Sequence, residues 1–171
     1  MLKDQQIDER YEWYTPKVYI DSVYKVLGHI DLDPASSMLA NNTVGALSYY
    51  TIDDDGLDQD WYGKVWMVPP FSPGMSSKFC MKLAEHVREG DITEAIVLVR
   101  NATDTGWFHE VAALSSAMVL HRKRIKFVSP IGNYEKSLIS MFGQVFIYIG
   151  TKQNIFLNEF SQFGYGCKTY R

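Results

Sequence analysis

The strongest constraint on the fold is the alternation of apolar runs with amphipathic segments along the middle of the chain. The run Glu94–Arg100 (EAIVLVR) has the length and the β-branched composition of a buried strand. Residues 75–88 before it carry apolar side chains at helical spacing, and residues 105–115 after it also favour a helix. Strands that alternate with helices are typical of an α/β domain, so we predict a mostly parallel sheet with helices on its faces.

Other segments extend this pattern on both sides. A helix is predicted over Lys17–Leu27, where Thr15 can cap the first turn, Pro16 can open it and Gly28 can end it. Strands are predicted over 29–33, 46–52, 64–68, 117–121 and 144–149, and a loop that enters a short helix is predicted over 35–42. Residues 154–171 carry no pattern that assigns them to an element.

Size and composition favour one domain over residues 1–171. The chain has 171 residues, of which 46% are hydrophobic, enough for a real core.

No apolar run approaches the ~20 residues of a membrane span, and the polar N-terminus lacks a signal-peptide core, so we expect a cytoplasmic protein without a membrane partner. The two cysteines lack metal-ligand spacing, so no metal site is expected. The net charge of −3 argues against a protein that coats nucleic acid but leaves room for a local basic patch.

Polar and proline-rich segments follow three of the predicted strands. They are Asp33–Ser36 (DPAS), Pro69–Ser72 (PPFS) and Arg100–Thr105 (RNATDT). In an open α/β sheet, ligands bind beyond the carboxyl ends of the strands. We therefore expect these three segments to border one functional site.

The run Val68-Pro69-Pro70-Phe71-Ser72 carries the most specific chemistry. Two prolines remove two backbone donors and stiffen the loop, while their carbonyls remain as acceptors at fixed positions. Phe71 offers a flat face on which a base could stack, worth ~1–3 kcal/mol. This arrangement suits methyl transfer to an exocyclic amine, because the amine donates hydrogen bonds to the acceptors and its lone pair can face the methyl donor. Taken alone, the run could also be a proline-rich turn with a core phenylalanine.

The order of several short motifs resembles the phage-type DNA N-6-adenine methyltransferase (Dam) family. The motifs are W-x-T-P at 13–16, D-x-D-P-A-S at 31–36, D-G-L at 55–57 followed by Trp61, P-P-F-S at 69–72 and T-D-T-x-W-F-H at 103–109. The resemblance covers residues 12–150. It implies a single-domain, Rossmann-like methyltransferase fold, S-adenosyl-L-methionine as cofactor, DNA adenine as substrate, no metal, and a phage- or prophage-encoded protein in a bacterial cytoplasm.

The resemblance also implies which residues bind the cofactor. Thr15 and Pro16 would lie beside its methionine part, and Asp33 would end the first strand against it. Asp55 follows Asp33 at the spacing of a ribose-binding acid, although a turn former in DDDG is an equal alternative. Trp61 would pack on the adenine ring. The full expected set is Trp13, Thr15, Pro16, Asp33, Pro34, Ala35, Ser36, Asp55, Leu57 and Trp61.

The expected catalytic loop, Val68, Pro69, Pro70 and Phe71, departs from the family at its first position. Family members have Asn or Asp there, whose oxygen accepts a hydrogen bond from the target amine, and a valine side chain cannot accept one. Losing one such contact typically costs ~10²–10³ in rate. The alternative function is therefore a catalytically impaired or inactive relative that binds cofactor or DNA. The chain also lacks the glycine-rich loop of many methyltransferases.

The expected DNA contacts are Ser72, Asn101, Thr103, Arg122, Lys123, Arg124 and Lys126. The four cations lie within the run 122–126 and could bind phosphates, or could simply form a solvated strand end. Asn101 and Thr103 follow the central strand and could equally belong to a capped helix start. Because a paired adenine is stacked, the enzyme must flip it out or use a single strand. The recognition sequence and the oligomeric state stay open.

Overall fold

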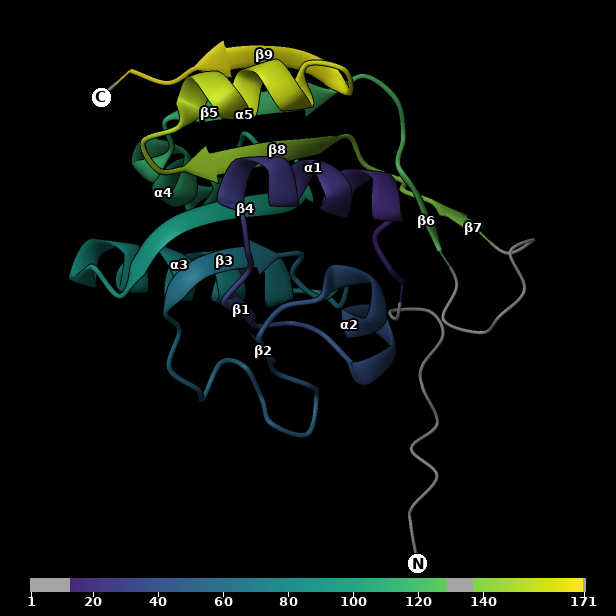
Figure 1. Ribbon diagram of the computed structural model, residues 1–171, viewed down its shortest axis with the longest axis vertical. Helices are drawn as coiled ribbons and strands as arrows, with labels where there is room; N and C mark the ends of the chain where they lie inside the picture. The colour runs from purple at the N-terminus through teal and green to yellow at the C-terminus, as the bar shows by residue number, and fades with distance from the viewer. Residues whose placement is uncertain (1–12, 129–136, 171) are drawn as a thin grey trace, which may run out of the picture.

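The computed structural model describes residues 13–128 and 137–170, and a seven-stranded sheet crosses it in the order β2-β1-β3-β4-β8-β5-β9 (Figure 1). The strands are β1 (Leu32–Asp33), β2 (Ser48–Tyr49), β3 (Gly63–Met67), β4 (Ile92–Arg100), β5 (Ala117–His121), β8 (Gln144–Ile149) and β9 (Gly164–Lys168). The Rossmann-like α/β class predicted from the sequence is thereby confirmed.

The prediction of a mostly parallel sheet is wrong. The pairs β1–β2, β1–β3 and β3–β4 are parallel, but β4–β8, β5–β8 and β5–β9 are antiparallel, so half of the neighbour pairs run in opposite directions. Parallel neighbours need a crossover connection, usually a helix. No helix is described between β5 and β8, and β8 returns from the edge at which β5 ends.

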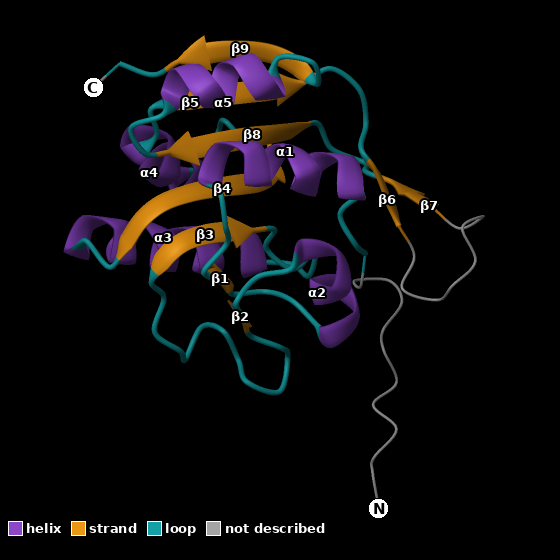
Figure 2. Cartoon of the chain, viewed as in Figure 1, coloured by secondary structure: helices purple, strands orange, loops and turns teal. Residues whose placement is uncertain are grey.

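Two layers of helix cover the sheet (Figure 2). Helices α1 (Lys17–Leu27) and α5 (Gln153–Phe160) pack on one face with a core that includes Val23, Phe146 and Phe156. Helices α3 (Met75–Glu89) and α4 (Gly106–Leu114) pack on the other face, around Leu83 and Val111. No helix among the described residues is long and apolar enough to cross a membrane.

Smaller elements gather at the edge where β3, β4 and β5 end. Helix α2 (Met38–Val44) follows β1, and the strands β6 (Lys126–Val128) and β7 (Ser137–Ile139) form a separate antiparallel pair (Figure 2). The predicted helix over 17–27 is confirmed, whereas the strands predicted over 29–33 and 46–52 shrink to β1 and β2. The C-terminal residues without a predicted element form α5 and β9.

Candidate active site

The proline loop lies where β3 leaves the sheet. Val68 follows the last residue of β3 and is half-buried, Pro69 is buried, and Pro70 and Phe71 are half-buried. Neither proline has an N–H, so the β3–β4 ladder cannot continue through them. The chain then turns and enters α3 after Gly74, whose φ of 80° is accessible to glycine.

This loop lines a cavity of about 700 Å³ together with three other parts of the chain. These are the residues before α1, the segment after β1, and the loop after β2. Of the expected cofactor contacts, seven line the cavity: Trp13, Thr15, Asp33, Pro34, Ala35, Ser36 and Asp55. The expected catalytic residues Val68, Pro69, Pro70 and Phe71 line it too, as does Ser72. The volume lies within the roughly 300–1,000 Å³ range of small-molecule sites.

Asp33 places a buried carboxyl group on the cavity wall. It is the last residue of β1 and only 4% exposed. Burial raises its pKa to about 7, and the hydrogen bond that the Ala35 backbone N–H donates to Oδ1 (3.2 Å) offsets part of this effect. A buried carboxylate is costly unless it is hydrogen-bonded or paired. A ligand group that donates hydrogen bonds or carries positive charge would therefore be stabilised here.

Two further buried polar atoms at the cavity have no hydrogen-bond partner among the described residues: Trp13 Nε1 and Ser36 Oγ. Unpartnered buried polar atoms are rare in folded proteins, and each costs about 1–3 kcal/mol. Ser36 is held in place by its backbone N–H, which donates to the Tyr50 carbonyl (2.8 Å). Its hydroxyl is near enough to Asp33 to lower the pKa of that carboxyl, but not in the geometry of a hydrogen bond. Both residues line the cavity, although the two atoms are themselves buried and lack a partner only among the described residues.

The loop after β2 approaches the segment after β1 very closely. At Gly56, a β-carbon would lie 2.1 Å from the Pro34 carbonyl oxygen, so only glycine fits. The neighbouring Asp55 has a φ of 48°, and its Oδ1 accepts a hydrogen bond from the Leu57 backbone N–H (3.1 Å). Asp55 is therefore a turn former that also lines the cavity, and its contact with a ribose stays a prediction.

Three expected cofactor contacts are not among the residues that line the cavity. Trp61 is 1% exposed and packs against Phe79 in the core, so the expectation that its ring covers the cofactor adenine is not supported. Its Nε1 instead donates to the Gly56 carbonyl (2.7 Å), which supports the close-packed loop. Leu57 packs against the same core, and Pro16 precedes the first turn of α1.

The β6 strand packs directly against the proline loop. The Phe127 ring is fully buried and meets Phe71 edge-on, with ring centroids 5.0 Å apart. Two backbone hydrogen bonds of 2.9 Å join Val128 to Tyr14, which lies on the cavity wall. No local pattern in the sequence predicts a role for Phe127 or Tyr14, because contacts between segments so far apart in the chain leave no local signal.

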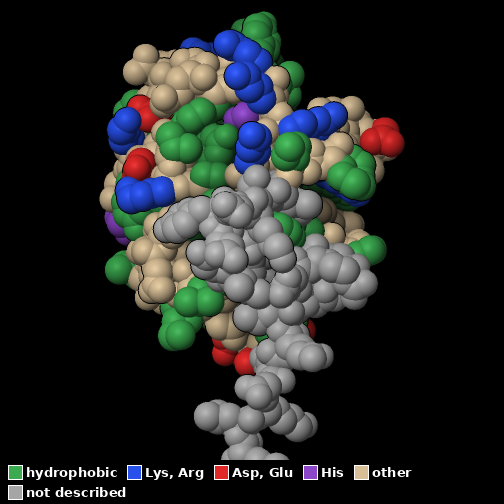
Figure 3. Space-filling model, turned by 90° about the vertical axis from the view of Figure 1, so that its right-hand side faces the viewer, with side chains coloured by type: hydrophobic (Ala, Val, Ile, Leu, Met, Phe, Trp, Pro, Cys, Tyr) green, Lys and Arg blue, Asp and Glu red, His purple; other side chains and the backbone are tan. Residues whose placement is uncertain are grey.

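The basic run leads into this strand. Arg122, Lys123, Arg124 and Lys126 are all exposed, whereas Ile125 is buried. Lys and Arg side chains gather on the upper part of this edge of the molecule (Figure 3). Lys126 directly precedes Phe127 and so lies nearest the proline loop, whereas Arg122 follows β5, three strand positions from β3.

Asn101 and Thr103 lie at the same edge but do not line the cavity. They follow β4, which is parallel to β3, and both are exposed. The Asn101 backbone N–H donates to the Gly143 carbonyl (2.9 Å), and the Thr103 carbonyl lies 2.9 Å from His109 Nε2. The His109 ring therefore contacts the loop between β4 and α4, and His109 does not line the cavity. Helix α4 begins after Thr105.

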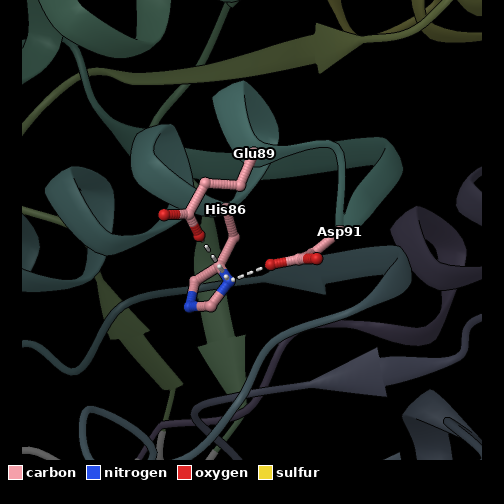
Figure 4. A group of neighbouring side chains, drawn as sticks. All are labelled: His86, Glu89 and Asp91. Carbon is pink, nitrogen blue, oxygen red and sulfur yellow. Dashed lines mark hydrogen bonds and ion pairs between the residues drawn. The ribbon is translucent and has the colours of Figure 1, made fainter.

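His86, Glu89 and Asp91 form a separate cluster at the end of α3 (Figure 4). Their ligand atoms lie within 4.8 Å of one another, a spacing that could hold a metal ion. Both carboxylates approach the same nitrogen, since His86 Nδ1 is 2.9 Å from Asp91 and 3.8 Å from Glu89. A histidine at a helix C-terminus is an ordinary site for such ion pairs. Asp91 directly precedes β4, so the cluster lies at the sheet edge opposite the cavity.

Comparison with known proteins gives one assignment. A search of curated proteins finds no match. The family model for DNA N-6-adenine-methyltransferase (Dam) matches residues 3–157, which include every segment that lines the cavity. The chain therefore belongs to the DNA N-6-adenine-methyltransferase (Dam) family.

Proposed function

We propose that the protein transfers a methyl group from S-adenosyl-L-methionine to the exocyclic amine of adenine in DNA. Membership of the Dam family supports a DNA adenine methyltransferase. The observation that carries the proposal is that the proline loop 68–71 and the segment 33–36 line one cavity. Methyl donor and acceptor must meet in one space, and this cavity provides the room for both.

The residues present fit the cofactor. S-adenosylmethionine carries an ammonium group, ribose hydroxyls and an adenine amine, which can donate hydrogen bonds to Asp33 and Ser36. Its acceptors suit Trp13 Nε1, which has no hydrogen-bond partner among the described residues. We assign its binding to Trp13, Thr15, Asp33, Pro34, Ala35, Ser36 and Asp55. When bound, it supplies an electrophilic methyl group on a sulfonium.

The proline loop positions the target amine. The carbonyl of Pro69 accepts a hydrogen bond from the amine, which leaves the nitrogen lone pair free for attack. Phe71 stacks on the base, and its edge contact with the buried Phe127 ring fixes the angle of that stacking face. The proton leaves the nitrogen after the methyl group has been transferred, so this chemistry needs no strong general base. Val68 lines the cavity, but its side chain cannot accept a hydrogen bond from the amine.

The exposed cations at 122–126 would bind phosphates of the DNA along this edge of the sheet. An adenine within a duplex must leave the base stack to reach a loop of this kind. Ser72, which lines the cavity, and the exposed Asn101 and Thr103 are the polar groups along this edge that could contact the DNA.

A methyl-transfer assay tests the proposal. Unmethylated DNA is incubated with the protein and radiolabelled S-adenosylmethionine, and N6-methyladenine is identified after digestion. We expect methyl incorporation by the parent protein and a loss for Phe71→Ala. The matched control is Tyr165→Ala, which removes an aromatic ring that is 72% exposed on β9, outside the family match. Cofactor binding without methyl transfer to any DNA would refute the enzymatic proposal.

A further inference from the structure

Two large apolar side chains stand exposed next to the expected DNA-binding edge. Residues 140–143 connect β7 to β8, and within this turn Met141 is 80% exposed and Phe142 is 51% exposed. Single exposed apolar residues are ordinary on protein surfaces. Here, however, the two are adjacent, and the backbone that carries them is fixed.

A buried hydroxyl holds this turn from inside. Ser140 is 9% exposed, and its Oγ donates to the Phe142 carbonyl (2.9 Å). The same oxygen accepts from Gln144 Nε2 (2.7 Å) and from the Phe142 backbone N–H (3.3 Å). A turn secured in this way presents its apolar side chains at a defined position.

The turn is also joined to the end of β4. The Asn101 side chain packs closely over Gly143, since a β-carbon there would lie 2.6 Å from Asn101 Nδ2. Arg100, the last residue of β4, pairs with Gln144 of β8. Since β3 is the other neighbour of β4, the turn lies two strand spacings, roughly 10 Å, across the edge from the proline loop.

A cation lies at the base of the turn. The Arg100 guanidinium is 5.6 Å from the centre of the Phe142 ring and 5.9 Å from that of Trp107. A positive charge can bind a phosphate, and exposed apolar side chains next to it can contact stacked bases. Duplex DNA offers both phosphates and stacked bases.

We propose that Phe142, with Met141 beside it, enters the base stack of duplex DNA and fills the gap that the departing adenine leaves. This inference rests on the proposed function and deepens it, because it makes duplex DNA the substrate. Apolar side chains inserted between base steps compensate for lost base stacking. Met141 and Phe142 are therefore positioning residues, whereas the loop 68–71 holds the target amine.

The test compares two forms of one DNA. Plasmid DNA from a host without adenine methylation is used as an intact duplex and after heat denaturation. We expect Phe142→Ala to lower methyl transfer to the duplex about tenfold or more while changing transfer to the single strand far less. Phe142→Leu keeps apolar bulk and should retain most of the duplex activity. Tyr165→Ala should leave both activities unchanged, and thermal melting checks that every variant folds.

A binding measurement separates failure of this inference from failure of the proposed function. The parent should bind a short duplex with one abasic site more tightly than the intact duplex, because the gap is already open, and Phe142→Ala should lose that preference. This result does not require methyl transfer. If no preference exists, or if Phe142→Ala lowers transfer to duplex and single strand equally, the inference is overturned. If the preference exists but no DNA is methylated, the base-stack role stands and the enzymatic proposal fails.

Discussion

Replacing Asp33 with Asn should stabilise the free protein and weaken cofactor binding. The carboxyl group is 4% exposed, and burial raises its pKa from 3.8 to about 7. The folded protein therefore binds the Asp33 proton more tightly than the unfolded chain does. It follows that the contribution of Asp33 to stability is most favourable at low pH and is lost as the pH rises from about 4 through about 7. Asn has no charge to bury, so the variant should not show this loss.

The size of the effect follows from the pKa difference. A rise from 3.8 to about 7 is about three pKa units. At about 1.4 kcal/mol per unit, the ionised carboxylate reduces the free energy of unfolding by up to about 4 kcal/mol near pH 8. The stability difference between Asp33→Asn and the parent should therefore be small near pH 4 and grow toward this limit. For a chain of this length, 1 kcal/mol corresponds to roughly 2–4 °C in Tm.

Urea unfolding without cofactor, followed by tryptophan fluorescence between pH 5 and pH 8, measures this difference. The control is Asp58→Asn, the same chemical change at an exposed carboxyl group, which should leave the pH profile unchanged. In the presence of S-adenosylhomocysteine, the parent should gain Tm and the Asp33→Asn variant should lose most of that gain. Equal pH dependence in the parent and the Asp33→Asn variant would show that ionisation of the buried Asp33 carboxyl does not destabilise the folded protein.

Three further predictions concern the proline loop and the basic run. Val68→Asn adds a side-chain acceptor for the target amine, so kcat should rise on the order of tenfold, with less change in KM, in steady-state methyl transfer; an unchanged kcat would show that another group already fills this role. Phe71→Ala should cost ~1–3 kcal/mol of transition-state stabilisation, measured as kcat/KM both in the parent and in the Val68→Asn variant. The triple change of Arg122, Lys123 and Arg124 to Ala should reduce the log–log salt dependence of DNA binding by up to ~3 units and leave cofactor binding intact, whereas an unaltered slope would identify the run as solvated surface.

The long, periodic helices and strands could be predicted from the sequence, and so could the position of the proline loop after a strand. The helix Lys17–Leu27 and the strand ending at Arg100 have local signals, namely helical spacing with a glycine stop and a continuous apolar run. The directions of β8 and β9 could not be predicted, because strand pairing depends on how distant segments meet. The match to the Dam family confirms the assignment that the motifs at 13–16, 31–36 and 69–72 suggested.

The donors and acceptors of the proline loop follow from the sequence alone, because a Pro-Pro pair removes backbone donors and the Val68 side chain lacks an acceptor in any fold. Which residues pack around that loop depends on how the chain folds. Trp61 is buried in the core, although the sequence suggested that its ring packs on a ligand. Phe127 packs against Phe71, although more than fifty residues of chain separate them. The physical reason is that burial and ring packing are properties of surfaces brought together by the sheet, and no local spacing in the sequence records them.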